Sequence, residues 1–548
     1  MRNHLIFNLF TVLFILSSSP LCSMKMEINI TVTSMVFSFP FATIVILTYC
    51  AWMLLNWAWL KPKKLENLLR RQGFSGNSYK LFYGDMKEMS MILKEARAKP
   101  ISLSDDIAQR ILPFDHHIIK KFGKNSFVWM GPKPSINITD PKLIREVLLN
   151  HEIFQKPQQS TLGKFIIHGM VMYEGEQWSK VRKIANPAFH QDKLKDMLPK
   201  FYLSCNEMIR KLRKILASKE ESFELDMWPH IQALTADVIS RSAFGSSYED
   251  GRKIFELIRD QINLFTEVLQ FVYIPGWRYL PTRTSRKMKA NHNEMRELIK
   301  GMINKREEEL KFGKSSVVND DLLGLLMESN HKIQEKEAGM SIEEVIEECK
   351  LFYIAGQETT ASLIVWTLVF LCMHPHWQEL AREEVRRVLG NQEPKFDDLN
   401  RLKILTKVIY EVLRFYTPAP LLTRRTSKET KLGEIFLPPG VGVSVPTILV
   451  HHDEEYWGED AKEFNPDRFS EGVSKASKNN QVAFFPFSWG PRICIGQNFA
   501  LLETKLALAM ILQNFSFKLS PAYAHAPARG ITVYPQHGAP MIVFLHEL

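Results

Sequence analysis

One stretch near the C-terminus decides how the rest of the chain is interpreted: FFPFSWGPRICIGQNFA, residues 484–500. It holds a single cysteine, Cys494, between Gly490 and Gly496. The apolar segment 499–515 follows, and because no face of it is consistently polar, we expect a buried helix. A cysteine just before a helix start gains from the unpaired N–H groups and the positive end of the helix dipole, which favour thiolate over thiol. The two glycines permit positive φ and leave room for a flat cofactor close to the backbone.

The fixed positions of this loop form a long pattern. Phe487, Gly490, Arg492, Cys494 and Gly496 have the spacing F-x-x-G-x-R-x-C-x-G, which resembles the haem-binding loop of the cytochrome P450 family at every fixed position. A buried structural cysteine is the alternative interpretation. The resemblance implies a haem b cofactor with the Cys494 thiolate as axial ligand of the iron, a ligand that favours O–O cleavage. It also implies that Arg492 binds a haem propionate and that Phe487 and the glycines shape the haem-binding loop.

Length, cysteines and charge narrow the class of protein. The 548 residues suffice for two or three average domains or for one large enzyme. Six scattered cysteines without a C-x-x-C motif argue against a disulfide framework or a zinc site, and for a catalytic body on the reducing side of a membrane. The formal net charge of +10 suits an acidic protein partner or an anionic membrane surface. Because we find no nucleic-acid-binding motif, we expect no nucleic-acid partner.

Two apolar segments precede the soluble body. Residues 35–60 are long enough to cross a bilayer of ~30 Å as a helix, and the lysines and arginines that follow predict that the rest stays in the cytosol. Residues 5–16 are shorter and are either a cleaved signal, a second membrane element or the product of an upstream start codon. We therefore expect a single-pass protein of the endoplasmic reticulum membrane. Its predicted parts are a signal-like and luminal segment (1–34), a transmembrane anchor (35–60), a basic linker (61–90) and a catalytic domain (91–548).

A long helix with an unusual centre is predicted from residue 342 to residue 373. A capping-box pattern at 341–344 begins it. Its centre, AGQETT at 355–360, starts with two small residues that would let a flat ring approach, and Thr359 can bond back to a carbonyl and loosen the helix. Glu358 offers an acid beside that hydroxyl, and an acid–alcohol pair can deliver protons during oxygen activation. A polar kink in a core helix is the alternative. The sequence resembles the oxygen-activation motif of the same family, so we predict that Glu358 and Thr359 are catalytic.

Further donors suit the two carboxylates of haem. Trp178 and Arg182 lie four residues apart in a segment predicted to be helical, 175–185, so an indole N–H and a guanidinium share one face. A packed surface pair is the alternative. Arg424 matches the family's propionate-binding arginine, with Arg425 as a close competitor. The resemblance implies that Trp178, Arg182 and Arg424 bind the propionates.

A charged triad is predicted to be structural. Glu411 and Arg414 are three residues apart on a predicted helix, 402–415, and match the family's E-x-x-R motif. Arg468 matches the third member of that ion-pair network. Buried charges need partners, so these residues are expected to hold the segment that leads to the cysteine loop.

The remaining patterns are local. We predict strands at 127–130, 135–138, 432–436 and 441–445, a buried helix at 231–244, an amphipathic helix at 252–271 and an exposed helix end and loop at 305–321. The helix at 252–271 is either the roof of a substrate chamber or an ordinary surface helix.

The resemblance implies a mostly α fold with a small β region, the cytochrome P450 fold, behind an N-terminal transmembrane helix. It implies a monooxygenase that reduces O2 with two electrons and inserts one oxygen atom into a C–H bond of a small hydrophobic substrate. The electrons would come from NADPH through a membrane-bound cytochrome P450 reductase. Lys180 and Lys183 are candidates to receive the acidic surface of that partner.

Three segments narrow the resemblance to one group within the family. Residues 57–66, 73–79 and 485–500 look like the plant clan that contains secologanin synthase and triterpenoid oxidases. This resemblance implies a terpenoid substrate, first a triterpenoid of the β-amyrin or oleanane type, then an iridoid or a gibberellin. An isomerase or dehydratase that uses a peroxide, or a non-catalytic haem-binding membrane protein, is the alternative class.

Overall fold

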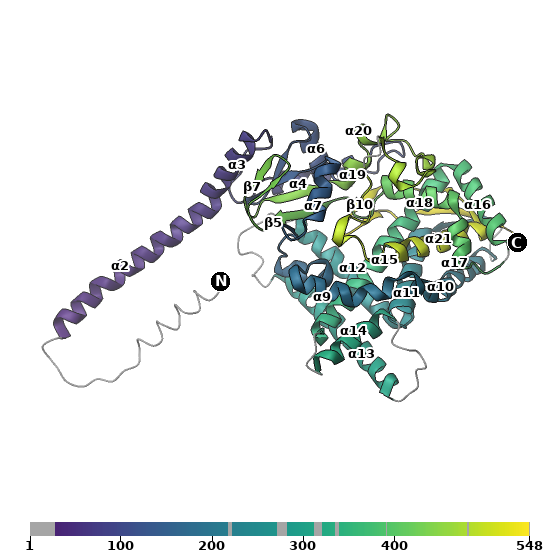
Figure 1. The fold of residues 1–548 in the computed structure, drawn as a ribbon, viewed down its shortest axis with the longest axis horizontal. Coiled ribbons are helices and arrows are strands. Elements are labelled where there is room, and N and C mark those ends of the chain that lie inside the picture. The colour runs from purple at the N-terminus through teal and green to yellow at the C-terminus, as the bar shows by residue number, and fades with distance from the viewer. Residues whose placement is uncertain are drawn as a thin grey trace. The chain divides into compact units, whose positions relative to one another are not determined.

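The computed structural model describes residues 28–217, 222–270, 282–311, 321–334, 339–390, 392–478 and 482–546 (Figure 1). The chain divides after Lys61 into two compact units, Met1–Lys61 and Pro62–Leu548. The second unit therefore includes nearly the whole segment 61–90, which we predicted as a linker.

The first unit contains helix α2 (Ile28–Leu55) and the π-helical turn η1 (Asn56–Leu60). Large apolar side chains of this helix are exposed, Ile44, Leu47 and Leu54 among them. The helical stretch Ala42–Arg71 is long and apolar enough to cross a membrane, and little of its apolar window is buried. These properties fit a membrane anchor. The signal-like residues 5–16 lie outside the described residues.

The predicted linker contains a folded helix, α3 (Lys61–Arg71). Leu69 is fully buried, and Glu66 is buried too. Glu66 accepts hydrogen bonds from a lysine and an arginine of its own helix. The segment predicted as a linker thus begins with a helix that i, i+3 and i, i+4 contacts stabilise.

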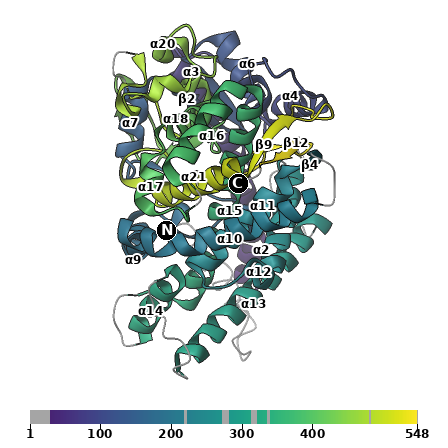
Figure 2. The same cartoon turned by 90° about the vertical axis from the view of Figure 1, so that its right-hand side faces the viewer.

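The second unit is built mostly from helices. They are α4 (Met86–Ala98), α5 (Ala108–Ile111), α6 (Pro113–Phe122), α7 (Pro141–Leu149), α8 (Thr161–Lys164), α9 (Gly175–Ala185), α10 (Gln191–Ala217), α11 (Met227–Ala243), α12 (Tyr248–Gln270), α13 (Arg283–Lys311), α14 (Leu322–Gln334), α15 (Ile342–Met373), α16 (Pro375–Leu389), α17 (Phe396–Arg401), α18 (Lys403–Phe415), α19 (Thr447–His451), α20 (Glu454–Trp457) and α21 (Gln497–Asn514). Short 3₁₀ turns include η2 (Gly169–Val171), η3 (Asn186–Phe189), η5 (Pro466–Phe469), η6 (Val473–Lys475) and η8 (Gly490–Arg492). Figure 2 shows α21 in the middle of this unit, with α10 and α11 below it and α16 and α18 above.

Helix α15 is the central helix of the unit. Its capping box forms as predicted, with the Ser341 hydroxyl accepting the Glu344 N–H and the Glu344 carboxylate accepting the Ser341 N–H. Most of its side chains are buried, and it packs against α11, α18 and α21. Its apolar half is therefore protein core, as predicted from the polar residues at its centre, although its length and composition alone would allow a membrane span.

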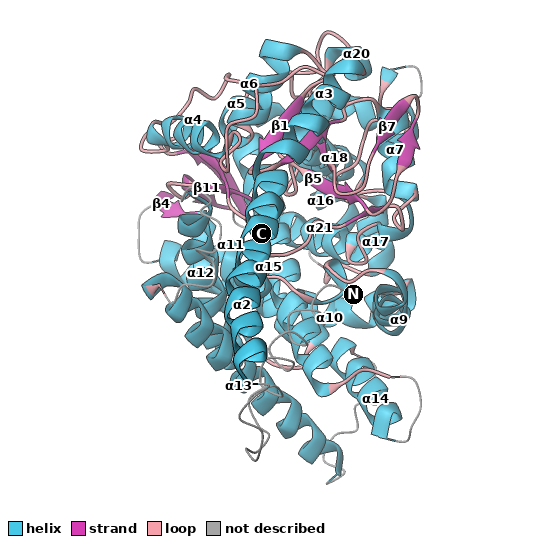
Figure 3. Ribbon diagram, turned by 90° about the vertical axis from the view of Figure 1, so that its left-hand side faces the viewer, coloured by secondary structure: helices cyan, strands magenta, loops and turns pink. Residues whose placement is uncertain are grey.

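The strands form small sheets. The largest has the order β1 (Phe127–Met130), β2 (Lys133–Asn137), β8 (Gly442–Val445), β5 (Leu422–Thr426), β3 (Phe154–Gln155), with β2 and β8 parallel and the other pairs antiparallel. The others are β4 (Ser222–Asp226) with β12 (Pro540–Leu545) and β9 (Phe515–Leu519), β10 (Pro527–Arg529) with β11 (Val533–Pro535), and β6 (Thr430–Leu432) with β7 (Ile435–Leu437). Figure 3 shows the strands in the upper half of the view, while α13 and α14 occupy its lower end. The fold is the predicted one, mostly α with a small β region.

Two local predictions were wrong. The predicted strand 432–436 is a hairpin, because Gly433 has φ of +55° and turns the chain between β6 and β7. The segment 305–321 is not wholly exposed: Arg306 and Asp321 are buried and form an ion pair at 2.9 Å. An arginine with a carboxylate partner can be buried where an unpaired one cannot.

Candidate active site

The cysteine loop leads into α21 as the sequence predicts. The Cys494 N–H donates to the Phe487 carbonyl at 2.9 Å, and α21 begins three residues later, after Gly496. Cys494 lies deep inside the protein, yet part of its side-chain surface is accessible. This deep position raises the pKa of the thiol, whereas the Gly496 N–H and the nearby Arg182 guanidinium lower it.

The two glycines of the cysteine loop differ in backbone conformation and in the space around them. Gly490 has φ of +73°, and a Cβ there would meet the Leu148 carbonyl oxygen at 3.0 Å, so both conformation and close packing require glycine. Gly496 has φ of −87°, and a Cβ would meet nothing closer than the Phe189 ring at 4.0 Å. The expected positive φ was therefore wrong for Gly496, and only the approach of a cofactor remains as a predicted reason for it.

Helix α9 brings two predicted residues to the cysteine loop. Arg182 Nη1 donates to the Ile493 carbonyl at 3.0 Å, next to Cys494. The Trp178 ring lies against the Arg492 guanidinium, with 4.6 Å between the guanidinium carbon and the ring centroid. The four-residue spacing thus places both side chains of α9 at the cysteine loop, rather than in a separate surface pair.

A cluster of buried cations adjoins these residues. We call Lys156, Arg424 and Arg492 the cation cluster. Its one carboxylate is Glu174: Arg492 Nη2 donates to Glu174 Oε2 at 2.6 Å and to the Tyr173 carbonyl at 2.6 Å. Burial and the neighbouring Arg492 lower the pKa of Arg424 to about 10, and burial with both arginines lowers the pKa of Lys156 well below its usual range.

Haem fits this charge distribution. Two buried guanidinium groups and the partly buried Lys156 lie near one carboxylate, that of Glu174. The Nε atoms of Arg424 and Arg492, like those of Arg425 and Arg468, have no hydrogen-bond partner among the described residues. Buried cations without partners are unfavourable, and the two propionates of haem would supply two negative charges. Sequence reasoning missed Lys156 and Glu174, because a single lysine in FQKP and a glutamate before a helix carry no family pattern and are brought together only by the fold.

The two arginines of β5 face different surroundings. Arg424 is buried and interacts with Arg492 and Glu174. Arg425 follows it on the strand and is only partly buried. Because successive side chains of a strand point to opposite faces, Arg424 belongs to the cation cluster and Arg425 points away from it.

The centre of α15 carries the predicted acid and alcohol. The Thr359 hydroxyl donates to the Ala355 carbonyl at 2.6 Å, as expected. Ala355 is exposed in the middle of this buried helix, so space remains beside it. Burial raises the pKa of Glu358 to about 7, and the Arg259 cation and the Gln357 side chain lower it. A carboxyl with this pKa can hold and release a proton near neutral pH.

Gly356 has a different neighbour from the expected one. A Cβ at this position would meet the Ile239 side chain of α11 at 2.7 Å. The glycine therefore allows close packing of α15 on α11, whereas we expected it to admit a flat ring. Ala355 alone keeps that predicted role.

The predicted ion-pair network assembles. Glu411 and Arg414 form two hydrogen bonds, at 2.7 and 2.8 Å, and neither side chain is exposed. Arg468 Nε lies 3.4 Å from Glu411 Oε1, and Asp460 supplies a second carboxylate to Arg468. Arg414 also donates to backbone carbonyls of the segment that precedes the cysteine loop. This geometry holds the chain in place and brings no charge to Cys494.

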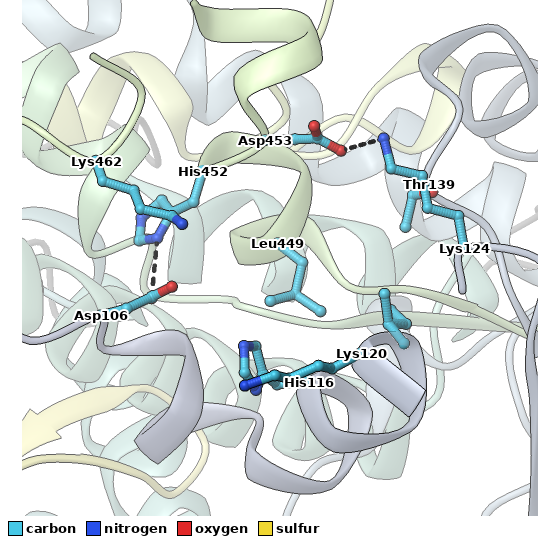
Figure 4. Close-up of a pocket in the computed structure, with 10 residues that line it drawn as sticks. Asp106, His116, Lys120, Lys124, Thr139, Leu449, His452, Asp453 and Lys462 are labelled. Carbon is cyan, nitrogen blue, oxygen red and sulfur yellow. Dashed lines mark ion pairs between the residues drawn. The ribbon is translucent and has the colours of Figure 1, made fainter. Parts of the chain in front are cut away.

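A separate cavity of about 190 Å³ contains none of the predicted site residues (Figure 4). It lies where α6 meets the segment from α19 to α20. Its charges are largely paired, with Lys124 at 2.6 Å from Asp453 and His452 at 3.5 Å from Asp106. A small cavity lined by ion pairs does not suit a large hydrophobic substrate.

Known proteins match nearly the whole chain. The protein-family model of cytochrome P450 matches residues 106–529. Cytochrome P450 72A397 of Kalopanax septemlobus is 56% identical over 502 residues, which cover 91% of this chain and 95% of the relative. Cytochrome P450 CYP72A219 of Panax ginseng is 53% identical over 512 residues, covering 93% and 98%. The 11-oxo-beta-amyrin 30-oxidase of Glycyrrhiza uralensis is 52% identical over 516 residues, covering 92% and 97%.

Proposed function

The chain belongs to the cytochrome P450 family as a plant haem b monooxygenase, and on this premise we propose that it oxidises a terpenoid, first a triterpenoid of the β-amyrin or oleanane type. One observation carries the substrate class: a relative 52% identical over 92% of this chain is named for oxidising 11-oxo-beta-amyrin. Enzymes of this family hold haem through a cysteine thiolate and receive electrons that originate from NADPH.

In this proposal Cys494 would ligate the haem iron, and the cation cluster together with Trp178 and Arg182 would hold the propionates. The surplus of cations over carboxylates supports this role. Haem bound there supplies the iron at which O2 is reduced and one oxygen atom is transferred to a C–H bond. Glu174 and the Trp178 ring fix the Arg492 guanidinium, so this side chain would be pre-oriented for a propionate.

The acid–alcohol pair of α15 moves protons. Below about pH 7 the Glu358 carboxyl holds a proton that it can pass toward the Thr359 hydroxyl. The bond from Thr359 to the Ala355 carbonyl fixes the hydroxyl beside the exposed surface of Ala355. The pair thus delivers protons where a small-residue surface leaves room for oxygen.

The proposed membrane and reductase partners rest on the family and on the charge of exposed side chains. We propose an anchor in the endoplasmic reticulum membrane and a NADPH-dependent reductase as electron donor. Lys183 is exposed and suits an acidic partner surface. Lys180 suits it less than we expected, because it pairs with Glu344 at 3.4 Å and donates to the Gly339 carbonyl.

Product profiling tests the substrate class. Microsomes that contain the full chain and a plant reductase are supplied with NADPH and with matched panels of oleanane triterpenoids, iridoids and gibberellins. We expect a hydroxylated or further oxidised triterpenoid only when NADPH is present. Turnover of an iridoid or gibberellin alone would replace the substrate class, and rearrangement or dehydration of an organic hydroperoxide without NADPH would indicate an isomerase or dehydratase.

The Cys494→Ser variant tests the ligand. We expect this variant to lose the thiolate-specific Soret band of the reduced carbon monoxide complex, because a serine oxygen replaces the thiolate. Cys372→Ser is the matched control, since Cys372 is a partly buried thiol with no predicted role. Survival of the band in Cys494→Ser would remove Cys494 as ligand.

A further inference from the structure

Glu348 is a buried carboxyl on the first half of α15 that the proposed chemistry does not use. Its side chain is fully buried, and Oε1 accepts the Met170 N–H at 2.7 Å. Oε2 has no hydrogen-bond partner among the described residues. Burial raises the pKa of Glu348 to about 8; the Met170 N–H lowers it, and Glu347 and Glu344 raise it further. A buried carboxyl in these surroundings is held more easily as the neutral acid.

The N–H that Glu348 accepts belongs to a segment, residues 169–174, that ends at the cation cluster. Arg492 Nη2 donates to the Tyr173 carbonyl and to Glu174 Oε2, at 2.6 Å in each case. Glu174 Oε1 accepts the Lys156 N–H at 2.6 Å. Hydrogen bonds therefore connect the buried carboxyl of α15, through residues 169–174, to the Arg492 guanidinium and to the backbone of Lys156.

The start of this segment is shaped around the carboxyl. Gly169 has φ of +79°, and a Cβ there would lie 2.7 Å from Glu348 Oε1. A side chain at this position would displace the carboxyl, and its backbone conformation would also be strained. The contact between Glu348 and residue 170 thus depends on the glycine that precedes it.

The charged groups around Glu348 give it no cation. On α15, Glu344 is held by the Ser341 cap and by Lys180 of α9, and Glu347 pairs with Lys350 at 2.5 Å. His292 of α13 lies 3.9 Å from Glu347. Tyr173, on the connecting segment, has its pKa raised by burial and by these three glutamates. Ionisation of Glu348 would therefore add a negative charge beside two others.

We propose that Glu348 is a positioning residue: as a neutral carboxyl it fixes residues 169–174, and through them it holds the Arg492 guanidinium against the haem propionates. The inference rests on the proposed haem binding by the cation cluster. Ionisation of Glu348 would bury a charge whose Oε2 has no partner among the described residues, which favours opening of this region to water even though the Met170 N–H still donates to Oε1. Such an opening would release residues 169–174, and Arg492 would lose its alignment.

The direction of the pH dependence follows from the raised pKa. The folded protein binds the Glu348 proton more tightly than the unfolded chain, whose carboxyl titrates near 4.5. The contribution of this group to stability is therefore fully present below about pH 4.5 and is lost as the pH rises toward about 8. Alignment of the segment should fail over the same rise toward about 8.

The experiment compares holoenzymes of the full chain in detergent. The variants are Glu348→Gln, which keeps a neutral acceptor, Glu348→Ala, which removes it, and the control Glu343→Gln on the exposed first turn of α15. The first readout is the rate at which haem passes to excess apomyoglobin at pH values on both sides of about 8. The second is hydrogen–deuterium exchange of residues 169–174, compared among the proteins at one pH.

We expect haem release from the wild type and from Glu343→Gln to accelerate several-fold as the pH rises through about 8. Release from Glu348→Gln should stay slow at every pH, and Glu348→Ala should release haem fast and exchange residues 169–174 faster than the wild type. The same pH-dependent rise in Glu348→Gln as in the wild type, or wild-type release and exchange in Glu348→Ala, would overturn the proposal. Failure of the proposed function is distinguishable, because it would remove the thiolate Soret band from the wild type itself.

Discussion

The ion-pair network and the cation cluster differ in how far protein carboxylates compensate their positive charges. In the ion-pair network, the Arg414 guanidinium donates to both oxygens of Glu411 and to three backbone carbonyls, and Arg468 has two carboxylates within reach. In the cation cluster, three cations lie near a single carboxylate, that of Glu174, which forms an ion pair with Arg492 alone among the described residues.

The difference separates structure from cofactor binding. A buried ion whose partners are all protein groups stabilises one arrangement of the chain. Removing one partner leaves the remaining charge buried and uncompensated in the low-dielectric interior. A buried cluster with surplus positive charge is unfavourable until an anion binds it. The first cluster should therefore govern folding, and the second should govern retention of the anionic cofactor.

The largest loss of stability is expected when the ion-pair network is broken. Glu411→Ala leaves Arg414 buried without its carboxylate, which should destabilise the protein by roughly 3–5 kcal/mol and remove most folded protein. Denaturant unfolding of the detergent-solubilised holoenzyme measures this. The control is Asp467→Ala, which breaks an exposed pair with Lys407 at 2.5 Å and should cost less than about 1 kcal/mol. Equal losses in the two variants would contradict a structural role that depends on burial.

A smaller and different effect is expected in the cation cluster. Arg492→Leu or Arg424→Leu removes a charge-assisted bond to a propionate, worth about 1.5–3 kcal/mol, so haem affinity should fall about ten- to a hundredfold. The haem-to-protein ratio measures this, with the exposed Arg401→Leu as control. In Arg424→Leu the stability of the haem-free protein should not fall, because repulsion between this guanidinium and Arg492 is relieved. If the haem-free Arg424→Leu protein unfolded as readily as Glu411→Ala, the cation cluster would be as important for folding stability as the ion-pair network.

The sequence predicted more residues of the ion-pair network than of the cation cluster. Glu411 and Arg414 share one turn of one helix, so their spacing predicts their contact. Trp178 and Arg182 were found for the same reason. Lys156 and Glu174 were not, because one follows β3 and the other precedes α9, and only the packing of distant segments brings them to Arg492.

The fold class and the long elements were also predictable, whereas tight turns and glycine roles were not. Helix α15 begins and ends where its capping box and the following proline predict. The hairpin at Gly433 was missed because an apolar run does not reveal where a single left-handed residue turns the chain. Gly356 was assigned to a cofactor although its Cβ position faces Ile239, a contact that depends on how α11 crosses α15.

Glu358 is a third kind of charged group: it is partly buried, Arg259 lowers its pKa, and it forms no ion pair among the described residues. Because its pKa is raised to about 7, the carboxyl keeps its proton below that pH and loses it above. Product formed per NADPH should therefore decrease as the pH rises through about 7. Glu358→Gln should give lower coupling that does not change with pH, whereas Glu343→Gln should follow the wild type. A wild-type pH profile in Glu358→Gln would exclude this carboxyl as the proton donor.

The smallest effect is expected at Arg425, which shares β5 with a member of the cation cluster. Its side chain is partly buried and points to the opposite face of the strand from Arg424. Arg425→Leu should therefore change haem affinity by no more than about twofold, the size typical of substitutions outside buried networks, while Arg424→Leu lowers it strongly. The two variants differ by one position on the same strand, so they match in local structure. If Arg425→Leu released haem as readily as Arg424→Leu, the face of β5 that we assign to the cofactor would be the wrong one.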